Sequence, residues 1–356
     1  MIAIEVHAAK HSYRALIDTG LLASAGRALK DVLPPTRCAV ISDRNVAHRF
    51  GDQLEKSLIA AGYEPQLITV PPGEESKTLA QTGDICEQML TNGLDRESFV
   101  IGLGGGMVGD LSGFVAAIFE RGIPHVQIPT TLLAMVDSSI GGKTGVNARA
   151  GKNLIGAFHP PTLVIDDVDV LKTLPQRELN QGFAEIIKHA VIADAEMFRQ
   201  LEDVDPDKVD FAPLVRRNIE IKSRIVEADE HERKSERALL NLGHTIGHAI
   251  ERASDYRDIL HGEAVSFGMA AACEVSMKKV GLPKKERDRI VDLLRKFGLP
   301  TQLPMDFPRD KIFDALEFDK KFSRGEVRFV VTPKIGSAKL SSDVTMVDLR
   351  SVIETL

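Results

Sequence analysis

The stretch "SFVIGLGGGMVGDLSGF", residues 98–114, gives the clearest indication of the fold. A short apolar run leads into three consecutive glycines, and an apolar pattern with helical spacing follows. Gly104, Gly106 and Gly109 fit the pattern G-x-G-x-x-G, in which glycine lets the backbone approach a pyrophosphate at a helix N-terminus. Glycine-rich turns also serve ordinary packing of a strand on a helix, so this pattern alone is weak. It predicts a strand, a loop and a helix in that order.

Strand-like runs on either side of this stretch extend the prediction. They alternate with helical patterns, and alternation of this kind predicts a parallel sheet with helices on both faces. The runs cover residues 37–43, 65–70, 98–104, 125–129 and 162–166, with helical patterns at 46–61 and 78–92.

The glycine loop differs in two ways from an ordinary Rossmann fingerprint. It follows the third strand of the series rather than the first, and the acid expected about 20 residues later is missing. Asp43 ends the first strand-like run and is the candidate partner for the ribose or adenine side of a dinucleotide. Asp110 is expected to cap the helix or to reach the cofactor. We predict a dinucleotide in a variant doubly wound domain.

The pattern changes after residue 172. Long amphipathic helices are predicted, followed by a strand pair at 327–333 and 338–342 and a last helix near Met346. The predicted fold is therefore an α/β N-terminal domain with a parallel, Rossmann-like sheet (1–172) and a mostly α-helical C-terminal domain (173–356). The predicted helices cover residues 175–202, 213–227, 238–253, 262–280 and 284–297.

Composition limits the possible partners. The net charge of −6 and the pI of about 6.0 argue against a nucleic-acid or anionic-membrane surface. Three widely spaced cysteines indicate neither a disulfide framework nor a cysteine metal site. The N-terminus lacks a signal-peptide pattern, and the most apolar run contains Asp110 and several glycines. We expect a soluble, cytoplasmic protein.

Two histidines in "LLNLGHTIGHAIE", residues 239–251, raise the question of a metal site. His244 and His248 are one helical turn apart, so their side chains share a helix face. This is the spacing of the zinc-binding pair in H-E-x-x-H enzymes, but no glutamate stands between them. From the residues alone, three alternatives are open: both bind a metal, one binds it while the other moves protons, or both are hydrogen-bonded core histidines.

Four motifs in the middle of the chain are specific enough to indicate a family. They are "PTTLLAMVDSSIGGKTGVN" (129–147), "GKNLIGAFHPP" (151–161), "LKTLPQRELNQGFAEIIKH" (171–189) and "RALLNLGHTIGHAIE" (237–251). Together they resemble the 3-dehydroquinate synthase family, sugar-phosphate cyclases that bind NAD and a divalent metal, and the resemblance covers nearly the whole chain. A wider superfamily, which includes glycerol dehydrogenase and iron-type alcohol dehydrogenases, shares the two-domain architecture but not these motifs.

The resemblance implies a metal site, and it resolves the question of the two histidines. Glu185, His244 and His261 are implied as ligands of one divalent ion, zinc or cobalt, and His248 remains as a polar, proton-handling group. One carboxylate and two imidazoles with open positions are typical of a catalytic zinc-type site. The resemblance also implies an active site in the cleft between the domains and a homodimer.

The resemblance further implies which residues contact substrate and NAD. Residues 233–236 stand where the family has a shorter link, which affects the expected pose of Arg237. The implied catalytic residues are Asp137, Lys143, Lys188, Lys222, Asn241 and His248. The implied substrate-binding residues are Arg121, Asn153, Arg237, and either Lys320 or Lys321. The implied NAD-binding residues are Asp43, Asn45, Glu74, Lys77, Gly104, Gly105, Gly106, Asp110, Thr130, Thr131, Lys143, Lys152 and Thr173.

The implied reaction converts 3-deoxy-D-arabino-heptulosonate 7-phosphate, a small anionic sugar phosphate, into 3-dehydroquinate and phosphate. It is a step of the shikimate pathway towards aromatic amino acids and chorismate. Transient oxidation by NAD is followed by phosphate elimination, reduction, ring opening and aldol closure, so the net chemistry is that of a lyase. The alternatives are a related cyclase that forms an inosose or a valiolone, a metal-dependent polyol dehydrogenase, and a catalytically silent binding relative.

Overall fold

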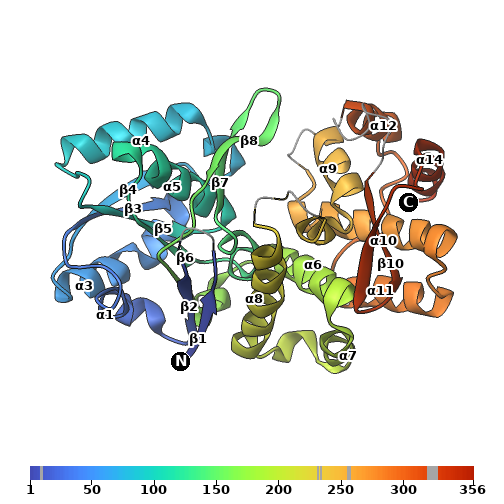
Figure 1. The fold of residues 1–356 in the computed structure, drawn as a ribbon, viewed down its shortest axis with the longest axis horizontal. Coiled ribbons are helices and arrows are strands. Elements are labelled where there is room, and N and C mark those ends of the chain that lie inside the picture. Colours follow the sequence, from blue (N-terminus) through green and yellow to red (C-terminus); the bar gives the residue numbers. More distant parts are fainter. Residues whose placement is uncertain (9–10, 231, 233–234, 255–257, 319–327) are drawn as a thin grey trace. The chain divides into compact units, whose positions relative to one another are not determined.

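The chain forms two compact units in the computed structural model, which describes residues 1–8, 11–230, 232, 235–254, 258–318 and 328–356 (Figure 1). The first unit comprises Met1–Leu174 and Phe211–His231, and the second comprises Pro175–Asp210 and Glu232–Leu356. Helix α8 (Phe211–Ala228) thus belongs to the first unit, whereas the predicted boundary near residue 172 placed it in the second. Its apolar face packs on the first two strands, and helical periodicity alone does not show what a helix packs against.

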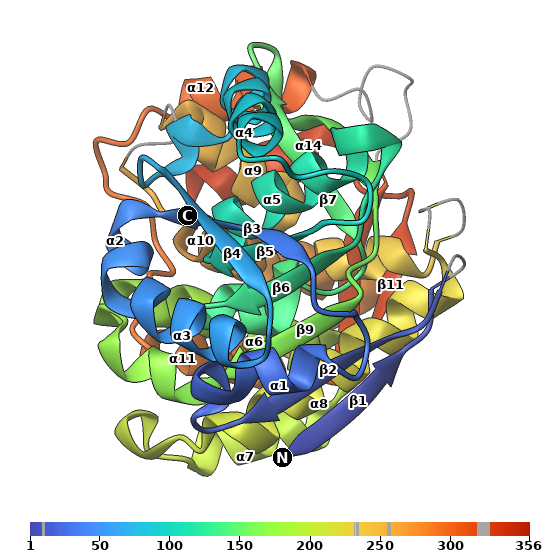
Figure 2. The same cartoon turned by 90° about the vertical axis from the view of Figure 1, so that its left-hand side faces the viewer.

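A seven-stranded sheet forms the centre of the first unit, with the order β1-β2-β9-β6-β5-β3-β4 (Figure 2). Only β1 pairs antiparallel with its neighbour, and the remaining pairs are parallel. The strands are β1 (Ile2–Val6), β2 (Tyr13–Asp18), β3 (Arg37–Asp43), β4 (Glu64–Val70), β5 (Phe99–Gly104), β6 (His125–Pro129) and β9 (Leu163–Asp167).

Helices cover both faces of this sheet, because the strands are apolar on both sides. One core lies under α1 (Ala25–Leu29) and α3 (Asp52–Ala60), and the other under α4 (Leu79–Thr91) and α5 (Gly106–Ile118). Figure 2 shows α1 and α3 in front of the strands. The predicted α/β class with a parallel, Rossmann-like sheet is confirmed.

The strand order places a switch point between β3 and β5. The chain runs from β3 outward to β4 and then returns to β5 on the other side of β3. Ligands of doubly wound sheets bind beyond the carboxyl ends of strands at such a point. Ser42 pairs with Leu103 there, so the next residues, Asp43 and Gly104, end neighbouring strands.

A hairpin of β7 (Lys143–Ala148) and β8 (Gly151–Phe158) lies between η5 (Ala134–Ser138) and β9 in the chain. Its sequence was interpreted only as a family motif, and no hairpin was predicted. The turns that flank the site are η3 (Glu74–Ser76), η4 (Phe119–Arg121), η5 (Ala134–Ser138) and η6 (Val168–Thr173), and α2 (Arg44–Val46) with η2 (Ala47–Gly51) precedes α3.

Helices dominate the second unit, as predicted, but two predicted helices are interrupted. The first breaks at Asp194, whose side chain accepts a hydrogen bond from the backbone N–H of Met197 and so starts a new helix. The second breaks at Gly243, whose φ of 80° is left-handed. The elements are α6 (Gln176–Ala193), α7 (Ala195–Asp203), η7 (Pro206–Lys208), η8 (Arg237–Asn241), α9 (His244–Ala253), α10 (His261–Val280), α11 (Lys284–Lys296), α12 (Arg309–Phe318), β10 (Phe329–Lys334), β11 (Ser337–Ser341) and α14 (Met346–Glu354). Among the described residues, none of the helices has the length and apolar character needed to cross a bilayer.

Candidate active site

The glycine loop connects β5 to α5 and allows the helix to pack closely on the sheet. A Cβ on Gly104 would lie 2.6 Å from the Cβ of Val108, and one on Gly109 would lie 2.6 Å from Oε1 of Gln127. These two glycines therefore allow close packing of α5 on the sheet. Gly105, the N-cap residue, supplies no side-chain acceptor, so the helix presents backbone N–H groups at the switch point. An N-terminus of this kind favours a phosphate.

Lys77 is the centre of a polar group in the first unit, which we call the lysine network: Glu74, Lys77, Asp110, Asn147 and Asn153. The Lys77 side chain is 3% exposed, and its Nζ donates to Oδ2 of Asp110 and to Oδ1 of Asn153, each at 2.5 Å. Burial alone would lower the pKa of Lys77, but Asp110 and Glu74 outweigh this effect and raise it. Asp110 lies within α5 and pairs with Lys77, so it is not the cap of that helix.

A second ion pair of the first unit joins α8 to η5. The Lys222 side chain is 7% exposed, and its Nζ donates to the Asp137 backbone oxygen at 2.5 Å and to Oδ1 at 2.7 Å. Both residues were implied as catalytic. Because α8 belongs to this unit, the structure brings Lys222 to Asp137 although 85 positions separate them in the sequence.

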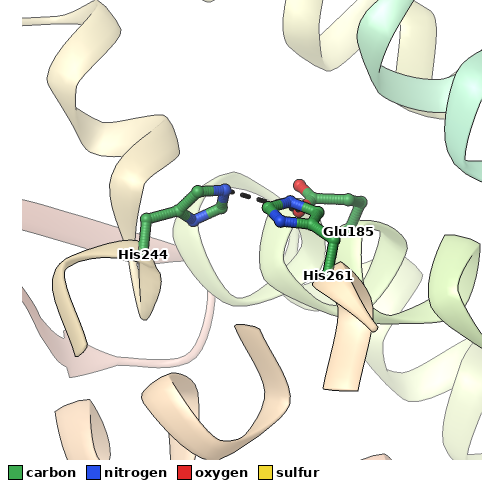
Figure 3. A group of neighbouring side chains, drawn as sticks. All are labelled: Glu185, His244 and His261. Carbon is green, nitrogen blue, oxygen red and sulfur yellow. Dashed lines mark ion pairs between the residues drawn. The ribbon is translucent and has the colours of Figure 1, made fainter. Parts of the chain in front are cut away.

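Glu185, His244 and His261 form the histidine cluster of the second unit (Figure 3). They come from α6 and from the first residues of α9 and α10. Oε1 of Glu185 lies 3.5 Å from Nε2 of His244 and 3.6 Å from Nε2 of His261. The Glu185 side chain is fully buried, and Oε2 forms an ion pair with Lys188, one turn along the same helix.

Electrostatics favour an ionised Glu185 and a neutral His244, but a protonated His261. Burial would raise the pKa of Glu185, but Lys188 and the facing imidazoles hold it well below its ordinary value. Burial and the Lys188 charge lower the pKa of His244, so its imidazole is neutral. Burial opposes protonation of His261, but the nearby carboxylates of Glu185 and Glu251 raise its pKa to about 10. A bound cation would replace the proton that these two carboxylates attract.

The arrangement of the histidine cluster fits a divalent metal. Neighbouring ligands of a tetrahedral zinc ion lie about 3.4 Å apart, given metal–ligand distances of about 2.1 Å. The two O–N separations match that spacing and are too long for strong hydrogen bonds. Each Nδ1 is held from outside: His244 by the Leu242 carbonyl at 3.2 Å, and His261 by Oε2 of Glu251 at 3.4 Å. Such contacts leave each Nε2 free to face an ion.

His248 lies next to this cluster but is exposed. Its ring centroid is 5.3 Å from that of His244 and 6.1 Å from that of His261. His248, Glu251 and His261 are also close enough to one another to hold an ion. The geometry therefore contains a second possible ligand set that includes His248, and metal analysis of variants can distinguish the two.

The other residues implied for the site lie on separate elements. Arg237 is buried and lies 3.9 Å from Glu232, and the preceding residues 233–234 are outside the described residues, as are Lys320 and Lys321. Asp43 caps α2 by accepting from the N–H groups of Asn45 and Val46. The remaining ones are Arg121 in η4, Thr130 and Thr131 after β6, Lys143 and Lys152 on the hairpin, Thr173 at the end of η6, and Asn241 at the end of η8.

Two residues that contact the implied set were not found from the sequence. Asn147 bonds to Glu74 and Asn153, and Glu251 bonds to His261. Both lie inside the quoted motifs, but each acts through another side chain. No spacing rule for ligands or for catalytic residues singles out such positions.

Solved structures with this fold include a valiolone synthase and an inosose synthase. The chain aligns with 2-epi-5-epi-valiolone synthase from Streptomyces hygroscopicus, bound to NAD⁺ and Zn²⁺, at 31% identity and a TM-score of 0.88, covering 98% of each chain. It also aligns with a 2-deoxy-scyllo-inosose synthase complexed with carbaglucose-6-phosphate, NAD⁺ and Co²⁺, at 25% identity and a TM-score of 0.89, covering 99% of each chain. Fold and histidine cluster together define the class of dehydroquinate synthase-like cyclases.

Sequence comparison identifies the family within this class. Residues 67–181 match the profile described as 3-dehydroquinate synthase N-terminal, and residues 182–322 match the one described as 3-dehydroquinate synthase C-terminal. A relative named 3-dehydroquinate synthase, from Thermodesulfovibrio yellowstonii, is 42% identical over 358 residues, which is 99% of each chain. The chain belongs to the 3-dehydroquinate synthase family, as its motifs predicted.

Proposed function

We propose that this chain converts 3-deoxy-D-arabino-heptulosonate 7-phosphate into 3-dehydroquinate and phosphate with NAD and one divalent metal. The observation that carries the proposal is the histidine cluster, set in a chain that is 42% identical over almost its full length to a 3-dehydroquinate synthase. The valiolone and inosose synthases are 31% and 25% identical, which favours the dehydroquinate reaction over theirs.

The residues present suit both cofactors. Glu185, His244 and His261 would hold the metal, and the glycine loop with Asp43 would hold NAD at the switch point of the sheet. When bound, NAD supplies a reversible hydride acceptor and the metal a Lewis acid. Both structural relatives contain NAD⁺ with Zn²⁺ or Co²⁺, which supports this pair of cofactors.

Buried cations would bind and orient the anionic substrate. Lys188 is 2% exposed and stands one helical turn from Glu185, so an anion bound there would lie beside the metal ligands. Lys222 donates a hydrogen bond to the carboxylate of Asp137, which would accept a hydrogen bond from a substrate hydroxyl. His248, exposed beside the cluster, would relay a proton. We propose that residues of both units take part in the reaction, so that neither unit is active alone.

The deciding experiment supplies NAD in amounts far below those of the heptulosonate phosphate and measures phosphate, 3-dehydroquinate and NADH. Equal amounts of phosphate and 3-dehydroquinate, well above the NAD added and without NADH accumulation, are expected. NADH formed in proportion to product would instead identify a polyol dehydrogenase. A hexose 6-phosphate turned over in preference would identify a sister cyclase.

We also propose a homodimer in the cytoplasm. Family resemblance supports the dimer, and the widely spaced cysteines Cys38, Cys86 and Cys273, all free thiols, suit a reducing compartment. Light scattering on the purified chain tests the dimer through its mass.

A further inference from the structure

Asn147 lies where two distant segments of the first unit meet. Its backbone N–H donates to the Lys77 carbonyl at 2.8 Å, and its side-chain Nδ2 donates to Oε1 of Glu74 at 2.9 Å. Its Oδ1 accepts from the backbone N–H of Asn153 at 3.0 Å. The first two hydrogen bonds join β7 to the loop of residues 71–78, and the third joins it to β8.

The hairpin is irregular at this residue. The pairing of β7 with β8 shifts register between Val146 and Ala148, so Asn147 does not occupy a regular ladder position. A β-bulge redirects a side chain and releases backbone groups from the ladder, and bulges are common beside active sites. Here the released N–H bonds to Lys77, and a bridge forms between Asn147 and Thr78.

Asn153 closes the network from the other strand. Its φ of 54° is left-handed, a conformation that asparagine tolerates better than most residues. Oδ1 of Asn147 holds the Asn153 N–H in this conformation, and Oδ1 of Asn153 accepts from Nζ of Lys77. Asn147, Asn153 and Lys77 therefore form a closed ring of hydrogen bonds.

We propose that Asn147 is a positioning residue that holds Glu74, Lys77 and Asn153 in one arrangement. The inference rests on the proposed function, because the family resemblance implies that Glu74 and Lys77 contact NAD and that Asn153 contacts the substrate. An amide is suited to this position because it can donate to Glu74 and accept from the Asn153 N–H at the same time. Asn147 thus orders the loop of residues 71–78 together with the hairpin of β7 and β8.

Two variants separate the functions of the amide. Asn147→Ala removes both side-chain hydrogen bonds, while Asn147→Asp keeps the acceptor and places a second carboxylate against Glu74. We expect Asn147→Asp to weaken NAD binding about 10-fold, measured by calorimetry on the metal-loaded protein. The KM for NAD should rise by a larger factor than kcat falls. Asn92→Ala is the matched control, because Asn92 makes only a local bond to the Gln88 carbonyl among the contacts described.

A double variant makes the test specific. In Glu74→Gln the new amide can donate to the carboxylate that Asn147→Asp introduces, so Asn147→Asp should weaken NAD binding less than about threefold in that background. The same 10-fold loss of NAD affinity in both backgrounds would overturn the proposal, since the contact between Asn147 and Glu74 would then make no contribution to NAD binding. Losses in binding that only follow a lower Tm would overturn it as well, because they show a purely structural role.

The wild-type protein separates this proposal from the proposed function. If it binds NAD but forms no 3-dehydroquinate, the proposed reaction is wrong, and the Asn147 variants are still decided by NAD binding. If the wild type forms 3-dehydroquinate and both variants bind NAD as it does, the proposal about Asn147 is wrong.

Discussion

The lysine network and the histidine cluster are both groups of buried charge, but they are organised differently. In the lysine network every described contact among side chains of Lys77, Asp110 and Asn153 is a hydrogen bond of 2.5 Å. In the histidine cluster the imidazole nitrogens stand 3.5 and 3.6 Å from the Glu185 carboxylate. The side chains of the lysine network are hydrogen-bonded to one another, whereas those of the histidine cluster are spaced for a metal ion between them.

This difference predicts which group depends on a ligand for its order. A buried polar group that is hydrogen-bonded within the protein is stable without further partners, whereas one left unpaired destabilises the fold. We therefore expect the histidine cluster to gain order and stability from a metal. The lysine network should keep its geometry when NAD is absent.

Removal of a metal ligand should have the largest effect. His244→Ala should lose bound metal, and turnover should fall below detection. Glu185→Ala should do the same, but it also leaves Lys188 buried without its carboxylate, at a cost of about 3–5 kcal/mol. Metal content by mass spectrometry, with Tm measured on the same samples, separates the two effects. Glu202→Gln, which alters a distant carboxylate paired with Arg289, is the control. Full metal content in both ligand variants would disprove the ligand set.

His248→Ala should have the next largest effect. If His248 relays a proton, the variant should keep its metal and lose about 10²–10⁴-fold in kcat. If the ligand set is instead His248, Glu251 and His261, metal and turnover should disappear together. Metal content beside kcat for this one variant distinguishes the two sets. A metal-free His248→Ala would show that our division between His244 and His248 is wrong.

Glu251 should tune the metal site without binding the ion. Its Oε2 lies 3.4 Å from Nδ1 of His261, the position of a carboxylate that orients a metal-binding imidazole. Glu251→Gln keeps an acceptor but loses the charge, so metal affinity should fall about 10- to 100-fold. Competition with a chelator of known affinity measures the change, again beside Glu202→Gln. An unchanged affinity would mean that a neutral acceptor, such as the Leu242 carbonyl that supports His244, suffices for both imidazoles.

The sequence predicted the elements of the sheet well because their patterns are local. β3 and β6 begin and end at the predicted residues, since each is a short apolar run with clear boundaries. The hairpin was missed because its polar and glycine-rich strands lack the apolar alternation of a buried strand. The breaks at Asp194 and Gly243 were missed because helical periodicity continues on either side of each.

The site was predicted in parts, according to how each residue acts. The three residues of the histidine cluster were named from motif positions, and the structure brings them together although α6 and α10 are far apart in sequence. That Lys222 meets Asp137 depends on where α8 packs, which no local pattern encodes. Asn147 and Glu251 support other side chains, and that relation exists only in three dimensions.

The smallest expected effect concerns His125, a histidine of the first unit that lies outside the proposed metal site. His125 is 1% exposed, neither ring nitrogen has a hydrogen-bond partner among the described residues, and its ring stacks on His159 at 5.1 Å. Burial, with the charges of His159 and His11, lowers its pKa from 6.5 to about 3. The folded state thus keeps His125 neutral, while the unfolded state takes up a proton below pH 6.5. The contribution of His125 to the free energy of unfolding is therefore fully present above pH 6.5 and is lost progressively as the pH falls towards 3.

Denaturant unfolding of the protein at about pH 7 and about pH 5.5 measures this dependence. His125 should account for a loss of about 1 kcal/mol between the two pH values, because the unfolded state gains a proton that the folded state excludes. His125→Leu should remove that share of the loss, and His48→Leu, a change at an exposed histidine, should not. An equal pH dependence in wild type and His125→Leu would show that His125 binds its proton equally well in the folded and unfolded states, so that burial does not keep its imidazole neutral.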